Sequence, residues 1–342
     1  GRTVTLAMLG EEGGMDHVFK TWEIVEGKPV LRDLYDLHPE TAERIDLARY
    51  VNFDLERIPA EEGVYAFVGH AREVPDDERV FVLADSRDRA SSAGHELANH
   101  LPAFEQTFQR ATRSLRTILQ VHDGRRRLRW NRIALYVAPA IYIDPTAIER
   151  ISSQLAPATR HLGLEKVLVR LNLLDREHPD RPPQSREIEI TDSSGQMEIA
   201  AREPHRDPLV PARSYERKLV ATRRQGQPYP YEIIKMLVSA DRGLLSGEAN
   251  ASMAPSAEGV FTEFELDPES VRPTAIPIAD RPYGGNKAAV VFGIISTPTA
   301  KYPEGMRRVL ALSDPSMGMG ALSAPECDRL VAAFDLAERE RL

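Results

Sequence analysis

Apolar residues recur at helical spacing in the segment that we predict to be the longest helix, from about residue 92 to 121. Phe104, Phe108, Ala111, Leu115 and Ile118 follow one another at steps of four, three, four and three residues. This spacing places all of them on one stripe of a helix. The pattern therefore predicts a long amphipathic helix that packs by one face against other elements.

Strand-like apolar runs flank this helix, and a second helix is predicted further along the chain. The predicted strands cover residues 63–74, 79–85, 132–143, 166–174, 186–191 and 196–201. The second helix begins at Asp144 and Pro145, a typical cap and first-turn pair, and its apolar stripe consists of Ile148, Ile151, Leu155 and Leu162. Because each helix has one apolar stripe, we predict an α+β fold whose sheet is covered on one face by the two long helices.

Shorter elements are predicted on both sides of this region. The N-terminal part reads as strands at 3–9 and 17–25, a helix at 39–50 and a short strand that begins at Asn52. The proline-rich residues 202–213 lack periodicity and predict a linker. Further along the chain, the predicted strands cover residues 215–224, 261–267, 288–295 and 309–312.

The last predicted helix has a clear start signal. Ser323 and Glu326 are three residues apart with a proline between them, which is the pattern of a capping box. Leu330, Phe334 and Ala337 follow at steps of three and four residues. We therefore predict that these three residues form the buried face of this helix.

Composition and charge narrow the classes of function. The chain has 342 residues, of which 42% are hydrophobic and 28% charged, as in ordinary globular proteins. Its net charge of −8 argues against a nucleic-acid or anionic-membrane partner. A single cysteine, Cys327, excludes an internal disulfide and favours a reducing compartment. No apolar run is long enough to span a membrane.

Three motifs suggest chemistry but fit better as ordinary structure. His95-Glu96 and His100 resemble a metalloprotease helix, but the histidines are five residues apart and a zinc pair needs four. Gly318-Met319-Gly320 resembles a dinucleotide-binding loop but lacks the third glycine. Lys235-Met236 resembles a biotin-acceptor site, but Ile234 occupies the place of the first methionine.

Other candidates also favour structural roles. A cluster of arginines could bind a phosphate or an acidic partner, although a solvated loop between elements is the stronger interpretation. The cluster consists of Arg125, Arg126, Arg127 and Arg129. His178 and His205 lie in proline-rich loops, and Cys327 lies in the first turn of the last helix. We therefore assign no catalytic, cofactor-binding or metal-binding residue.

Several motifs, in order along the chain, resemble the long single-chain biotin-dependent acetyl-CoA carboxylases. Arg49 precedes Asn52-Phe53-Asp54-Leu55, Ile58-Pro59 follows it, and residues 137–149 resemble the family's strand-to-helix junction. The remaining motifs are Tyr229-Pro230-Tyr231-Glu232, the Glu263-x-x-Leu266-Asp267 strand end, Tyr283-Gly284-Gly285-Asn286, Tyr302-Pro303-Glu304-Gly305 and Ser313-Asp314. The sequence departs from the family at Ile234 and Lys235, which suggests a divergent branch.

This resemblance implies a domain organisation and a function. Residues 1–205 would be the last central, non-catalytic α+β domain, and 206–342 the start of a crotonase-like α/β carboxyltransferase domain that continues beyond Leu342. The whole enzyme would be a ligase that makes malonyl-CoA from acetyl-CoA, bicarbonate and ATP for fatty-acid synthesis. This segment would position the carboxyltransferase and have no activity alone.

Cofactors and partners follow from the same resemblance. Biotin would be attached to a carrier domain, and ATP with Mg or Mn would bind a biotin carboxylase domain, both outside this chain. The partners would be these domains and further copies of the enzyme in a homodimer or larger homo-oligomer in the cytoplasm, with no nucleic acid and no membrane. The alternative is a free-standing scaffold or interaction protein that shares only the fold.

Overall fold

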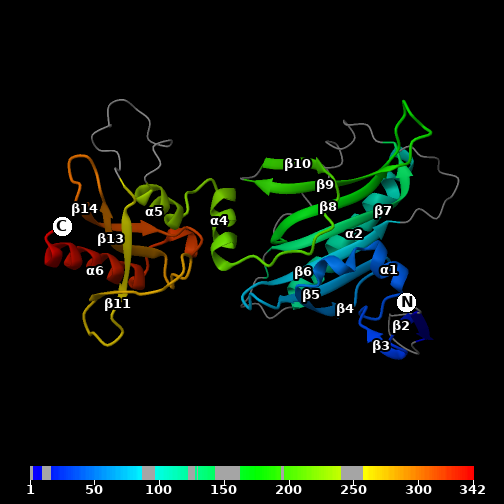
Figure 1. The fold of residues 1–342 in the computed structure, drawn as a ribbon, viewed down its shortest axis with the longest axis horizontal. Coiled ribbons are helices and arrows are strands. Elements are labelled where there is room, and N and C mark those ends of the chain that lie inside the picture. The colour runs from blue at the N-terminus through cyan, green and yellow to red at the C-terminus, as the bar shows by residue number, and fades with distance from the viewer. Residues whose placement is uncertain are drawn as a thin grey trace. The chain divides into compact units, whose positions relative to one another are not determined.

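The chain forms two compact units, which are described separately. A computed structural model describes residues 3–9, 17–86, 97–121, 128, 130–142, 162–193, 196–239 and 257–342. The first unit is Gly1–Arg213 and the second is Ser214–Leu342 (Figure 1). The division therefore falls after the last residue of the predicted linker. Together the units form a mixed α/β structure with several sheets and few helices.

A seven-stranded sheet is the centre of the first unit. Its strands are β4 (Phe53–Ile58), β5 (Val64–Ala71), β6 (Glu78–Ser86), β7 (Asn131–Ile141), β8 (Leu164–Leu173), β9 (Gln184–Ser193) and β10 (Gln196–Arg202). They lie in the order β10-β9-β8-β7-β6-β5-β4. The β6–β7 and β7–β8 pairs are parallel and the other neighbours are antiparallel. Pro139 lies where the β7–β8 register shifts, between Tyr136 and Ala140, so the bulge expected there is present.

The long helix and its apolar stripe are confirmed. Helix α2 (Leu97–Val121) connects β6 to β7. All five stripe residues are buried, and they share one core with Val82, Ile133 and Val169 of the sheet. The second predicted helix, with Ile148, Ile151 and Leu155, lies outside the described residues, whereas Leu162 is buried in the same core.

The sheet is covered on both faces, so the prediction of one covered face is wrong. Helix α1 (Pro39–Arg44) and the short helix η1 (Leu47–Tyr50) pack on the face opposite α2. The reason is visible in β6, where Val80 and Val82 point to the α2 core while Phe81 and Leu83 point to the other core. A strand that is apolar on both sides has to be covered on both sides.

The helix predicted at residues 39–50 is interrupted. Helix α1 ends at Arg44, and Asp46 adopts a left-handed conformation (φ 50°) before η1 begins. A small antiparallel sheet precedes it, with β1 (Thr3–Leu9), β2 (His17–Val25) and β3 (Lys28–Arg32). Strand β3 was not predicted. It pairs with β2, and the two strands are joined by a two-residue turn of Glu26 and Gly27. Both residues have positive φ, as a type I′ hairpin turn requires.

The second unit has three layers. Its sheet contains β11 (Val260–Leu266), β12 (Ala275–Pro277), β13 (Val290–Thr297) and β14 (Met306–Ser313), in the order β12-β11-β13-β14 and antiparallel throughout. Helix α6 (Ala324–Glu340) packs on Phe264, Phe292 and Ile294. Helix α5 (Pro230–Val238) packs on the opposite face through Tyr231 and Ile234. The order β13, β14, α6 predicted for the end of the chain is present.

Two predictions in this unit are wrong. Residues 215–224 form a helix, α4 (Ser214–Arg224), and not a strand. The capping box of Ser323 and Glu326 is confirmed, but α6 buries Ala332, Ala333 and Leu336, whereas Phe334 is 73% exposed. Small alanines allow the helix to approach the sheet closely, and this determines which of its two apolar stripes is buried.

Candidate functional site

The end of the predicted linker is bound to the first unit. Residues 205–212, here called the strap, follow edge strand β10 and cross the face of the sheet that carries α1. The backbone of Leu209 donates to the Arg49 carbonyl (2.6 Å) and accepts from Asn52 Nδ2 (3.0 Å). The Leu209 side chain is buried in the α1-side core. The Ala212 N–H donates to Asp77 Oδ2 at 2.7 Å.

Buried ion pairs fix the groups that hold the strap. Asp77 is fully buried and accepts two hydrogen bonds from Arg79, at 2.6 and 2.5 Å. Arg79 also contacts Glu165 (3.1 Å), which forms two bonds with Arg132 at 2.5 and 2.7 Å. The pKa of Glu165 lies below its usual value, because hydrogen bonds and the charge of Arg132 outweigh the effect of burial, which raises it.

The first half of the strap lies over charged residues of β8 and β9. Arg170 donates to the His205 carbonyl (3.0 Å) and to Glu187 (2.8 Å). His205 Nδ1 lies 3.3 Å from Glu187, which Arg49 also contacts at 3.4 Å. His205 is therefore an outer contact of the strap on the sheet. Within the described residues, the strap thus has polar contacts at His205, Leu209 and Ala212, and its buried apolar side chain is that of Leu209.

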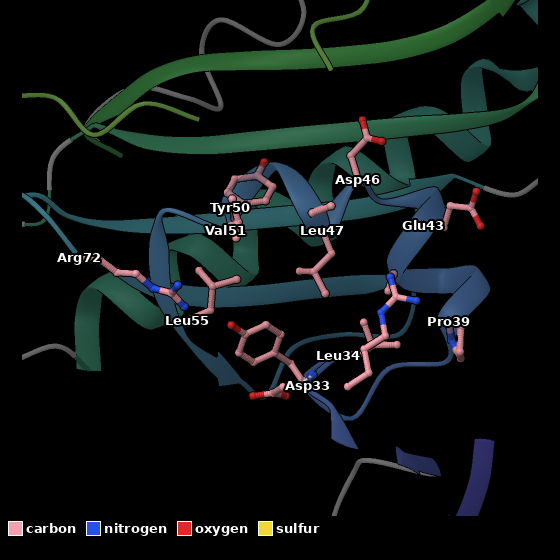
Figure 2. A pocket seen from close by; sticks show the side chains of 14 residues that line it. Asp33, Leu34, Pro39, Glu43, Asp46, Leu47, Tyr50, Val51, Leu55 and Arg72 are labelled. Carbon is pink, nitrogen blue, oxygen red and sulfur yellow. Dashed lines mark hydrogen bonds between the residues drawn. The ribbon is translucent and has the colours of Figure 1, made fainter. Parts of the chain in front are cut away.

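A pocket of about 690 Å³ lies beside α1 in the first unit (Figure 2). Its apolar lining includes Leu34, Leu47, Tyr50 and Leu55. Tyr35 also lines it, in a left-handed conformation (φ 52°) that bulky residues rarely adopt. Burial, and then the negative charge of Asp33, raise the pKa of the Tyr35 hydroxyl. The volume is in the usual range of small-molecule sites.

Charged side chains of both signs surround this pocket. They are Arg32, Asp33, Glu43, Asp46 and Arg72. Asp33 accepts from the Tyr35 N–H, Asp46 pairs with Arg170, and Arg72 donates its Nε to Asp54 at 2.8 Å. Within the described residues, no hydrogen bond or ion pair engages the side chains of Glu43 and Arg32. The pocket therefore presents free cationic and anionic groups over an apolar floor.

The second unit has a polar centre of its own. Lys218 donates to the Gly284 carbonyl (2.8 Å) and to Asn286 Oδ1 (3.1 Å), and Asn286 donates to buried Asp314 at 2.8 Å. Burial lowers the pKa of Lys218, although Asp314 raises it. The Tyr229 hydroxyl is buried and has no hydrogen-bond partner within the described residues. These contacts hold the turn from Tyr283 to Asn286 in place. Because the Lys218 ammonium already donates to the Gly284 carbonyl and to Asn286, we assign it no catalytic or ligand-binding role.

The motifs weighed in the sequence give no reactive site within the described residues. Gly318–Gly320 is a short turn whose Met319 is 86% exposed. Lys235 lies on α5, where its ammonium pairs with Glu232 at 3.2 Å. His178 is exposed beside Asp175 (3.2 Å), and Cys327 is exposed.

The other candidates fall in segments that the structure does not describe. These are His95-Glu96, the side chain of His100, and Arg125, Arg126, Arg127 and Arg129. Among the described residues, no group of three or more His, Cys, Asp or Glu could hold a metal ion. No helix in the same ranges is long and apolar enough to cross a membrane.

Comparisons with known proteins find similar folds among solved structures but no match by sequence. No protein-family model matches the sequence, and no curated protein sequence matches it. Among solved structures, the crystal structure of the central domain of yeast acetyl-CoA carboxylase is similar, with a TM-score of 0.44 and 16% sequence identity. The similarity covers 67% of this chain and 34% of that chain, so this chain spans about a third of its length.

Proposed function

We propose that this chain is a non-catalytic segment of a biotin-dependent acyl-CoA carboxylase, in which the first unit is a scaffold. The strap is the observation that carries this proposal. It fixes Ala212 to buried Asp77, one residue before the first unit ends. The tethered chain that follows is thereby held at one point, and restraint of this kind raises the effective concentration of linked groups.

The motif residues of the sequence support the same proposal. Arg49 and Asn52, which belong to the first carboxylase-like motif, supply the backbone and amide groups that hold Leu209. Phe53 of that motif packs edge-on against Phe81, in the core that also buries Leu209. The motif that includes Arg49, Asn52 and Phe53 would then have a structural role, which is to hold the strap on the first unit.

The rest of the enzyme belongs to the proposal as well. The second unit, Ser214–Leu342, would be the start of a crotonase-like carboxyltransferase domain, so this domain would begin after the strap and not at residue 206. The substrate would be acetyl-CoA, carboxylated to malonyl-CoA in the cytoplasm. Biotin would be on a carrier domain, and ATP with Mg or Mn on a biotin carboxylase domain. Both would be partners outside this segment, in a homodimer or larger homo-oligomer.

The test separates scaffolding from chemistry in the longer polypeptide that contains this chain. Leu209→Asp should release the strap and lower acetyl-CoA carboxylation about tenfold or more, because misplaced reactants lose rate steeply. Biotin-dependent ATP cleavage should stay unchanged. Val210→Asp is the matched control, since this neighbour is 75% exposed. Equal carboxylation in both variants would refute the scaffold role, and a polypeptide without any biotin-dependent activity would favour the free-standing scaffold.

A further inference from the structure

We infer that the pocket beside α1 binds a short zwitterionic peptide, with its ammonium at Glu43 and its carboxylate at Arg72. This inference does not depend on the carboxylase proposal. It rests on the position of the charged side chains, on which of them are already engaged, and on the apolar surface between them.

The two charged ends of the pocket lie apart. Figure 2 shows Arg72 at one side of the pocket and Glu43 at the other, with Leu47 and Leu55 between them. Glu43 comes from α1, whereas Arg72 directly follows β5. A ligand that reaches both groups therefore has to be elongated, with opposite charges at its two ends.

The hydrogen-bonding capacity of these two side chains is not used up. Glu43 is exposed and its carboxylate has no partner within the described residues. Arg72 donates only its Nε to Asp54, at 2.8 Å, so both terminal amino groups can still bind a carboxylate in the two-bond geometry of guanidinium groups. Both charges are thus available without breaking an existing contact.

The middle of the pocket is apolar. Leu47 is buried, and Leu34 and Leu55 are half-buried. An apolar side chain placed over them would remove their remaining surface from water, which is favourable. An extended tripeptide spans roughly 10 Å, and such a ligand fits a pocket of about 690 Å³. A tripeptide with free termini and apolar side chains therefore matches the charges at the two ends of the pocket and the apolar surface between them.

Two further carboxylates of the pocket lining already have partners. Asp33 is engaged by the backbone of Tyr35, and Asp46 by Arg170. Arg32 adds a second guanidinium to the lining, and within the described residues its side chain has no hydrogen bond or ion pair. A purely cationic ligand would face Arg32 and Arg72, and a purely anionic one would face Glu43, so a ligand with both charges fits best.

Calorimetric titration of the 342-residue chain with trileucine tests this inference. Saturable binding is expected. N-acetyl-trileucine and trileucine amide should each bind about tenfold more weakly, because each loses one charge-assisted contact. Glu43→Gln should lower the affinity for trileucine about tenfold, and N-acetylation should then make no further difference. Arg72→Met should behave in the same way toward the amide.

The controls make the outcome decisive. Glu40→Gln removes a carboxylate from the same helix outside the pocket lining, and it should bind trileucine like the unchanged chain. Circular dichroism should show that each variant is folded. The blocked peptides are titrated into the unchanged chain, so they test the inference even if a variant fails to fold. Absence of saturable binding at millimolar trileucine, or equal binding of free and blocked peptides, would overturn the inference. So would a loss with Glu40→Gln equal to that with Glu43→Gln.

Discussion

Individual buried charges account for how the first unit holds its own linker. Asp77 has no exposed surface and binds both the Arg79 guanidinium and the Ala212 N–H. A charge in such a place is tolerated because a buried guanidinium neutralises it and both of its oxygens accept hydrogen bonds. The same carboxylate therefore stabilises the sheet and fixes the strap.

We expect Asp77→Ala to destabilise the chain by about 3–5 kcal/mol, because Arg79 would lose its main partner while still buried. The free energy of unfolding in urea measures this. Asp76→Ala is the matched control, since Asp76 is an exposed neighbour. A loss of equal size in both variants would show that the ion pair is not the cause.

Glu326 gives a prediction for the pH dependence of the second unit. Hydrogen bonds from the Ser323 hydroxyl and then from the Ala289 N–H lower its pKa from 4.5 to about 2. A lowered pKa in the folded state adds stability above the unfolded pKa, and this stability is lost as the pH falls.

Glu326→Gln should therefore be less stable than the unchanged chain at pH 7, and the difference should shrink as the pH falls from about 4.5 toward 2. Urea unfolding at several pH values, followed by a signal of the second unit, measures this. A difference that is constant with pH would mean that the carboxylate charge does not matter.

At the scale of elements, the sequence predicts what local periodicity determines. The stripe of α2 is predictable because a single apolar face recurs over about four turns of helix, from Phe104 to Ile118. Helix α4 was not predicted because its apolar face is short: Tyr215 and Leu219, four residues apart, pack on the core, and charged residues surround them. In α6 the error has a different cause, since this helix has two apolar stripes and only tertiary packing decides between them.

Phe108 tests the core between α2 and the sheet. It is 2% exposed, and Phe108→Ala should cost about 3–5 kcal/mol through lost burial and the cavity that remains. Val121→Ala at the exposed end of the same helix should change the stability by less than about 0.5 kcal/mol. An unchanged melting temperature for Phe108→Ala would reject this packing.

Two substitutions, compared by their effect on the free energy of unfolding, test which face of α6 is buried. Leu336→Ala should cost about 2–5 kcal/mol because Leu336 is fully buried. Phe334→Ala should have little effect on the free energy of unfolding, although phenylalanine is the larger side chain. If Phe334→Ala proves the more costly, the helix is rotated relative to this description.

At the scale of the whole molecule, the strap and the pocket could not be predicted from the sequence. The bond from Asn52 to Leu209 joins residues 157 positions apart, and the strap itself lacks any periodic pattern. The pocket combines Arg32, Glu43 and Arg72, which only the packing of α1 beside β3, β4 and β5 brings together. Long-range contacts of this kind leave no local signal.

The 342-residue chain alone should not decarboxylate malonyl-CoA in the presence of free biotin. Within the described residues we find no group suited to bind the thioester oxygen, and loss of a single such donor lowers a rate about 10²–10³-fold in a well-studied hydrolase. Release of acetyl-CoA measures the reaction, with a longer polypeptide that includes a whole carboxyltransferase as the positive control. Turnover above the buffer blank would mean that this chain contains a complete active site.

The path of the strap also decides how the first unit responds to a pull at its C-terminal end. Without the strap, a force on the chain after β10 would act on an edge strand and open its hydrogen bonds one after another. With the strap, the force first meets Ala212 and Leu209, which are held at Asp77 and Asn52, toward the other edge of the sheet. The contacts along the strap would have to fail before β10 is loaded. The strap thus keeps a pulling force on the following chain from acting directly on edge strand β10.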